Sequence, residues 1–108
     1  MAKYLFQASY TSEAWAAQVR NPQNRVEAIR PVIERFGGRL DSAYYAFGEY
    51  DVVVIAEIPD PVSAAALAIA VTAGGAAKAI KTTPLLTIEE GIEAMRKASG
   101  AGYRPPES

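Results

Sequence analysis

The chain has 108 residues, of which 50 % are apolar and 21 % charged, and its formal net charge is −1. This length suits a single domain with its own hydrophobic core, and so small a net charge gives no long-range field for polyanions, so we expect no nucleic-acid partner. The sequence contains no Cys and no His, which excludes disulfides, thiolate nucleophiles, imidazole bases and the usual Zn, Cu or haem ligands. We therefore expect neither a metal site nor a cofactor.

The N-terminal residues, Met1 to Phe6, lack a basic segment followed by a long apolar stretch and a cleavage site. Secretory signal peptides need all three features. We therefore expect no signal peptide, no membrane anchor and a cytoplasmic location.

Residues Lys3 to Tyr10 alternate in a way that predicts a strand. One face would carry Tyr4, Phe6, Ala8 and Tyr10, and the other Leu5, Gln7 and Ser9. A short helix is expected from Glu13 to Arg20, capped by Thr11 or Ser12.

A second helix is predicted after it, because Asn21-Pro22 places a capping residue before a proline. Its apolar stripe consists of Val26, Ile29, Ile33 and Phe36. Pro31 lies inside this stripe and removes a backbone hydrogen bond, so we expect a kink or a restart there. Gly37-Gly38 would end the helix.

Two further strands are predicted, from Arg39 to Phe47 and from Asp51 to Ile58. Gly48-Glu49 suits a two-residue turn with positive φ at its first position. The strand ending at Ile58 is apolar on both faces over most of its length, so both faces of the sheet should be covered.

The last third of the chain predicts a helix, a strand and another helix. Asp60-Pro61 would begin a helix that carries no charged face up to Val71. A fourth strand is expected over residues 76–83, before Pro84. Thr87 and Glu90 form a capping box for a final helix. Its residues Ile88, Ile92 and Met95 are expected to face inward.

The predicted order is β-α-β-β-α-β plus a C-terminal helix, which is the α+β, ferredoxin-like pattern with an antiparallel four-stranded sheet. Residues 1–99 would form this single domain, and residues 100–108 a flexible tail. Both crossover helices cover one face of such a sheet. We expect a second copy of the chain to cover the other face, giving a homodimer or a higher homo-oligomer.

Four segments of the chain form a linked set of motifs: Tyr10-Thr11, Phe36 to Leu40, Phe47 to Ile55 and Glu57 to Asp60. Together they resemble the GYD domain family of small bacterial and archaeal proteins. The resemblance covers most of Lys3 to Lys97 and implies a dimeric α/β barrel. Members of that superfamily include small-molecule binding modules, cofactor-free oxygenases, isomerases and decolorising peroxidases.

Tyr50 and Asp51 are the sharpest catalytic candidates, with Tyr45 as a third. A phenol and a carboxylate at the rim of a hairpin could act as acid and base. Alternatively, Asp51 could accept backbone N–H groups while Tyr50 packs its ring against the sheet edge. Adjacent residues of a strand face opposite ways, so the pair need not share a pocket.

Five residues are ligand-binding candidates, because pockets in folds of this kind commonly open between sheet and helices. They are Gln7, Ser9, Trp15, Tyr45 and Lys81. The polar members could equally lie in an ordinary interface, and a lone Trp in a small domain is more often part of the core.

Two kinds of function are consistent with these residues. The first is a non-catalytic homo-oligomer that binds a small apolar molecule or a partner surface, at the sheet-helix or the subunit interface. The alternative is a cofactor-free enzyme of the isomerase or oxygenase type, acting on a small aromatic or carbonyl compound. In that case Tyr50, Asp51 or Tyr45 would move protons, and Lys81 or backbone donors would stabilise an anion. A third reading is a regulatory module whose tail docks elsewhere.

Overall fold

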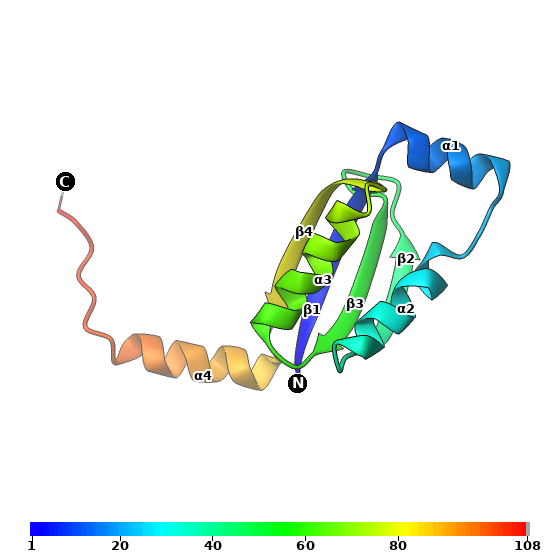
Figure 1. The fold of residues 1–108 in the computed structure, drawn as a ribbon. Coiled ribbons are helices and arrows are strands. Elements are labelled where there is room, and N and C mark those ends of the chain that lie inside the picture. Colours follow the sequence, from blue (N-terminus) through cyan, green and yellow to red (C-terminus); the bar gives the residue numbers. More distant parts are fainter. Residues whose placement is uncertain (108) are drawn as a thin grey trace.

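The structure of the chain, a computed structural model, describes residues 1–107. The elements in chain order are β1 (Ala2–Tyr10), α1 (Ser12–Arg20), α2 (Arg25–Arg35), β2 (Arg39–Tyr45), β3 (Val52–Ile58), α3 (Pro61–Ala73), β4 (Ala77–Leu85) and α4 (Ile88–Ser99). The strands form one sheet in the order β2-β3-β1-β4, and every neighbouring pair is antiparallel (Figure 1). This confirms the predicted α+β, ferredoxin-like fold with a C-terminal helix.

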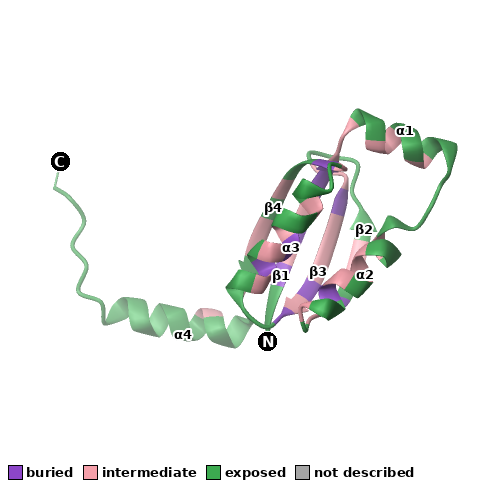
Figure 2. Ribbon diagram, viewed as in Figure 1, coloured by how far each residue is buried: buried purple, intermediate pink, exposed green. Residues whose placement is uncertain are grey.

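The hydrophobic core lies between the sheet and the two helices α2 and α3, which cover one of its faces (Figure 1). The strand alternation places Tyr4 and Phe6 of β1 on this face, beside Ala56 of β3. The buried members of the main cluster are Tyr4, Phe6, Ile33, Leu40, Ala56, Ile58, Ala64 and Leu67. Figure 2 shows that burial concentrates in this layer.

Helix α2 begins later than the sequence predicts. Asn24 is its N-cap, and the Asn24 side chain accepts hydrogen bonds from the backbone N–H groups of Val26 and Glu27. Asn21 instead ends α1, where its N–H bonds to the carbonyl of Ala17. The prediction of a helix start at Asn21-Pro22 is therefore wrong. The helix also continues through Pro31 without a restart, because its apolar stripe is packed against the sheet.

Gly38 allows the end of α2 to approach β3 closely. Its N–H bonds to the carbonyl of Ile33 at 3.0 Å, after Gly37 has reversed the chain at a φ of +82°. A Cβ atom on Gly38 would lie 2.4 Å from the carbonyl oxygen of Glu57. No larger residue fits there without moving backbone, which explains the glycine pair that ends this helix.

The hairpin between β2 and β3 differs from the predicted two-residue turn. Strand β2 ends at Tyr45 and β3 begins at Val52, and the N–H of Ala46 bonds to the carbonyl of Asp51 at 2.9 Å. The positive φ, 49°, falls on Phe47 and not on Gly48. A bulky residue rarely adopts this conformation, so the loop is held by contacts that local turn chemistry does not reveal.

Strand β4 runs through Pro84, although the sequence predicted that it would end before this residue. Pro84 is paired with Tyr4 of β1. Proline lacks the N–H group that a central strand needs, but β4 lies at the edge of the sheet, where one side of the backbone has no strand to bond.

Helix α4 has the predicted capping box but not the predicted packing. The Thr87 and Glu90 side chains each accept the other's backbone N–H. None of its residues is buried, and Ile88, Ile92 and Met95 are 78 %, 42 % and 70 % exposed. The helix extends away from the sheet (Figure 1), so these three side chains do not face inward within one chain.

The second face of the sheet is not covered by helices. Its central strands present the half-buried side chains of Leu5, Val53 and Ile55. We call this surface the open face.

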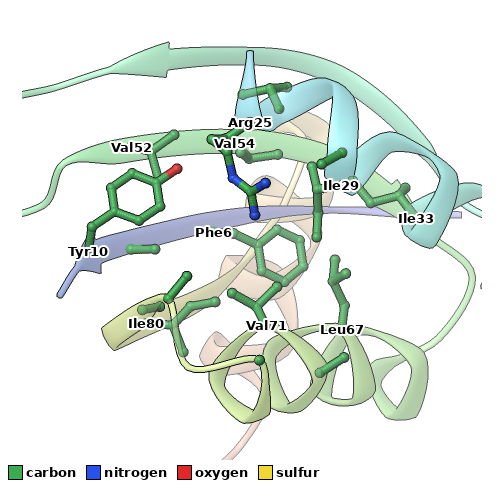
Figure 3. A pocket seen from close by; sticks show the side chains of 17 residues that line it. Phe6, Tyr10, Arg25, Ile29, Ile33, Val52, Val54, Leu67, Val71 and Ile80 are labelled. Carbon is green, nitrogen blue, oxygen red and sulfur yellow. The ribbon is translucent and has the colours of Figure 1, made fainter. Parts of the chain in front are cut away.

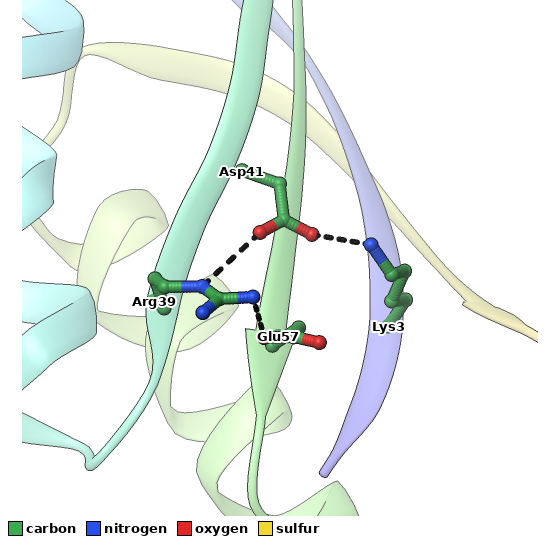
Figure 4. A network of polar contacts seen from close by, with 4 residues as sticks. All are labelled: Lys3, Arg39, Asp41 and Glu57. Atoms are coloured by element: carbon green, nitrogen blue, oxygen red, sulfur yellow. Dashed lines mark hydrogen bonds and ion pairs between the residues drawn. The ribbon is translucent and has the colours of Figure 1, made fainter.

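A charged network lies at one end of the open face (Figure 4). The Asp41 carboxylate accepts from Lys3 at 2.7 Å and from Arg39 at 3.4 Å, and Arg39 also pairs with Glu57. The hydrogen bond from Lys3 holds the pKa of the Asp41 carboxyl below its usual value.

Candidate functional site

A cavity of about 260 Å³ lies between the sheet and helices α2 and α3 (Figure 3). Strand β1 contributes Phe6 and Tyr10, α2 contributes Arg25 and Ile29, and α3 contributes Val71. Tyr10 and Arg25 are the only lining residues with polar side chains. The cavity is therefore an apolar chamber with a phenol and a guanidinium as its two polar groups.

The sequence places both polar residues through simple periodicities. Tyr10 follows Phe6 and Ala8 on the helix-facing side of β1, because alternate residues of a strand share a face. Arg25 is the first residue of α2 and lies one turn before Ile29. Residues four apart share a helix face, so the Arg25 side chain is on the side of α2 that faces the cavity.

The Tyr10 phenol is half-buried. Burial raises the pKa of Tyr10, with Tyr45 and Asp51 acting in the same direction and the positive charge of Arg25 opposing them. The phenol is consequently neutral at physiological pH and can donate a hydrogen bond.

An aromatic cluster stands beside the cavity at the end of the sheet. Trp15 lies edge-to-face against Tyr10 at 5.3 Å between ring centroids, and stacks on Phe47 at 6.2 Å. Tyr45 stacks on Phe47 at 5.7 Å. These contacts hold Phe47 in its unusual backbone conformation and attach α1 to the hairpin.

Asp51 connects this cluster to β1. One oxygen of its carboxylate accepts from the backbone N–H of Tyr10 at 2.9 Å and from the indole N–H of Trp15 at 3.2 Å. The Asp51 N–H donates to the carbonyl of Ala8 at 2.9 Å. The carboxylate thus holds the hairpin and the Trp15 ring in place. This agrees with the alternative expectation that Asp51 accepts backbone N–H groups.

Neither Asp51 nor Tyr50 lines the cavity. Tyr45 lines a second hollow of about 430 Å³ beside α2 and β2. The surroundings of this second hollow include the Glu27–Arg30 ion pair and several other polar side chains, so water suits it better than an apolar ligand.

The other ligand-binding candidates lie elsewhere. Gln7 and Lys81 are partners in the β1–β4 register, so the structure brings them together on the open face, across the sheet from the cavity. Ser9 is buried on the same face, where its hydroxyl donates to the carbonyl of Glu49 at 3.2 Å. Trp15 belongs to the aromatic cluster.

The chain was compared with known families and proteins. The model of the GYD domain family matches residues 4–95. The chain belongs to this family. No curated protein and no solved structure matches this GYD domain.

Across residues 1–107 of the GYD domain protein, no group of three His, Cys, Asp or Glu side chains is placed to hold a metal ion. Within the same residues, no helix combines the length and the apolar character needed to cross a membrane.

The sequence reasoning missed Tyr10 and Arg25 as site residues of the GYD domain. The alternation of β1 did place Tyr10 on the helix-facing side. Arg25 belongs to a series with Arg20, Arg30 and Arg35 at every fifth residue, a spacing that leaves no single basic stripe on a helix and favours solvated charges. Once the helix is taken to start after Asn24, the four-residue spacing places Arg25 and Ile29 on the same helix face. This spacing is the sequence signal that could have identified Arg25.

Proposed function

We propose that this GYD domain is a non-catalytic binding protein that takes a small apolar molecule into the cavity between its sheet and helices α2 and α3, and that it works as a homo-oligomer. The observation that supports the binding role is the cavity itself. Of its 17 lining residues, all except Tyr10 and Arg25 lack polar side chains.

The size and chemistry of the cavity suit an aromatic ring. An apolar protein cavity of about 150 Å³ stays dry and binds benzene, and this one measures about 260 Å³. The phenyl ring of Phe6 and the aliphatic side chains of Ile29 and Val71 surround the space (Figure 3). Transfer of an apolar ligand from water into it is favourable by about 25 cal/mol for each Å² of apolar surface removed from water.

Exposed apolar surface supports the proposal of a homo-oligomer. The open face carries the half-buried side chains of Leu5, Val53 and Ile55 on its central strands, and α4 exposes Ile88 and Met95. Figure 2 shows that α4 contributes almost no buried surface. Contiguous apolar surface on a small protein marks an interaction site. A second copy of the sheet, set face to face against the first, would cover the open face.

The alternative of a cofactor-free enzyme has less support. The Asp51 carboxylate already accepts two N–H groups, and neither it nor Tyr50 reaches the cavity. The proton-transfer roles of Tyr50, Asp51 and Tyr45, and the anion role of Lys81, stay predictions.

The binding role is tested by filling the cavity. Thermal unfolding is measured with and without 2-naphthylmethanol, a neutral bicyclic probe, in the wild type and in Ala70→Phe, which adds a ring at an exposed residue that lines the cavity. The matched control is Ala65→Phe, at an exposed position of the same helix that does not line the cavity. We expect the probe to raise the Tm of the wild type and the control but not of Ala70→Phe, because only a ligand of the folded state stabilises it. A probe that shifts no protein, or all three equally, contradicts the proposal.

The oligomer is tested by light scattering at micromolar concentration. We expect a mass above the 11.5 kDa of one chain. Ile55→Glu on the open face should reduce the mass to that of one chain, because it would bury an unpaired carboxylate, whereas Ile69→Glu on α3 should leave it unchanged. A monomeric wild type contradicts this part of the proposal.

A further inference from the structure

We propose that the ligand of the cavity is a small monocarboxylate with an aromatic or aliphatic body, whose carboxylate binds the Arg25 guanidinium and the Tyr10 hydroxyl. This inference rests on the proposed function, since it assumes that the cavity is a binding site. It adds the chemical class of the ligand and the two residues that recognise it.

The polar groups of the cavity are placed together. In Figure 3 the guanidinium of Arg25 points from α2 into the space between Tyr10 and Phe6, and the Tyr10 hydroxyl points toward it. Ile33 and Leu67 belong to the part of the lining that is buried in the core. A ligand with one polar end and one apolar end would satisfy both parts of this lining.

Arg25 forms no ion pair with a carboxylate among residues 1–107. Among residues 1–107 the structure contains ion pairs for Lys3, Arg30, Arg39 and Arg96, and none for Arg25. The nearest acidic residue in its helix, Glu27, is engaged by Arg30 at 3.1 Å. Asp51, on the other side of Tyr10, is engaged by two N–H donors. Arg25 is thus an exposed residue that lines the cavity, and its guanidinium has no ion-pair partner in the part of the chain that the structure describes.

An anion completes this arrangement better than a neutral or cationic group. A guanidinium and a neutral phenol both donate hydrogen bonds, and a carboxylate has two oxygens that accept them. Coulombic attraction is stronger beside apolar walls than in water. A ligand cation would be repelled, and an alcohol would gain hydrogen bonds without the charge interaction.

The volume limits the body of the ligand. At about 260 Å³, the cavity is roughly 110 Å³ larger than an apolar cavity of about 150 Å³ that binds benzene. It has room for a carboxylate attached to one or two rings, or to a short branched chain. It has no room for a long fatty acid.

The test compares two probes that differ mainly in charge, 2-naphthoate and 2-naphthylmethanol, by titration calorimetry at pH 7. The variants are Arg25→Gln and Tyr10→Phe, with Arg35→Gln as the control because it makes the same charge change at the far end of α2. Circular dichroism checks that each variant is folded.

We expect the wild type to bind 2-naphthoate at least tenfold more tightly than the alcohol. Arg25→Gln should weaken 2-naphthoate by about 10- to 100-fold, as loss of a charged hydrogen-bond partner predicts, and should change the affinity for the alcohol much less, because Gln keeps an N–H donor. Tyr10→Phe should weaken 2-naphthoate about 2- to 10-fold, and Arg35→Gln should change neither affinity.

Two results would overturn the inference while leaving the proposed function intact: equal affinities for both probes, or a preference for 2-naphthoate that survives Arg25→Gln. Failure of both probes to bind the wild type would overturn the proposed function and the inference together.

Discussion

Removal of the Asp51 side chain should destabilise the whole fold, because it leaves two N–H groups without their acceptor. Its carboxylate accepts from the Tyr10 backbone at 2.9 Å and from the Trp15 indole at 3.2 Å. Hydrogen bonds to a charged group contribute about 1.5–3 kcal/mol each. Asp51 is partly exposed, so water replaces some of this loss. We expect Asp51→Ala to lower the free energy of unfolding by about 3 kcal/mol.

Asp51→Asn keeps an oxygen acceptor and loses only the charge, so it should cost about 1 kcal/mol. Urea unfolding followed by fluorescence is a direct assay, since the chain has a single Trp and Asp51 bonds to it. With m-values of about 1–3 kcal/mol/M, Asp51→Ala should lower the unfolding midpoint by about 1–3 M. Protein concentration must be fixed, because self-association would change the midpoint.

Glu49→Ala is the matched control. Glu49 lies in the same loop and is exposed, and only its backbone carbonyl is used, by Ser9. A surface change of this kind should alter stability by no more than about 0.5 kcal/mol. If Asp51→Ala and Glu49→Ala shift the midpoint equally, the structural role given to the Asp51 carboxylate is refuted.

Three further predictions concern packing, pH and the last helix. Gly38→Ala should lower the unfolding midpoint by an amount equivalent to about 1–3 kcal/mol, because its Cβ would meet backbone at 2.4 Å, whereas Gly91→Ala, in open space on α4, should not lower it. The Asp41 pKa lies below its ordinary value of 3.8, mainly through Lys3. Its stabilising effect is thus present above this pH and is lost as the pH falls through the lowered pKa. The difference in urea midpoint between wild type and Asp41→Asn should therefore shrink below pH 3.8, and a constant difference would contradict this. Thr87→Ala should reduce the helical signal in circular dichroism by fraying α4, at a cost of about 1 kcal/mol to that helix, but leave the midpoint of a monomer unchanged because no α4 residue is buried.

Local signals predicted most of the fold. The alternation of β1, the cap at Thr11, the Asp60-Pro61 helix start and the capping box at Thr87 all appear in the structure as expected. Each depends on residues within about one turn or one strand, where sequence spacing and spatial proximity agree.

The errors occurred where distant residues decide the outcome. The hairpin was expected to turn at Gly48, but the positive φ is at Phe47, whose ring stacks on Trp15 from a different part of the chain. Pro84 was expected to end a strand that continues, since only the strand order shows β4 to be an edge.

The candidate site was harder to predict than the fold for the same reason. Gln7 and Lys81 were expected to bind a ligand; they are partners in the β1–β4 register, but the cavity lies on the opposite face of the sheet. The packing of α2 and α3 decides on which face of the sheet the cavity forms. No single segment of the sequence contains that information.

The sequence by itself determined the order of the elements, their apolar faces and the GYD resemblance, because periodicity and capping are local properties. Only the tertiary structure decided the roles of Asp51, Tyr10 and Arg25. The Asp51 carboxylate, which was a catalytic candidate, accepts hydrogen bonds from the Tyr10 backbone in β1 and from the Trp15 indole. The tertiary structure also placed the Arg25 guanidinium and the half-buried Tyr10 phenol in the lining of one apolar cavity. Such contacts join residues far apart in the chain, so they exist only once the helices have packed on the sheet.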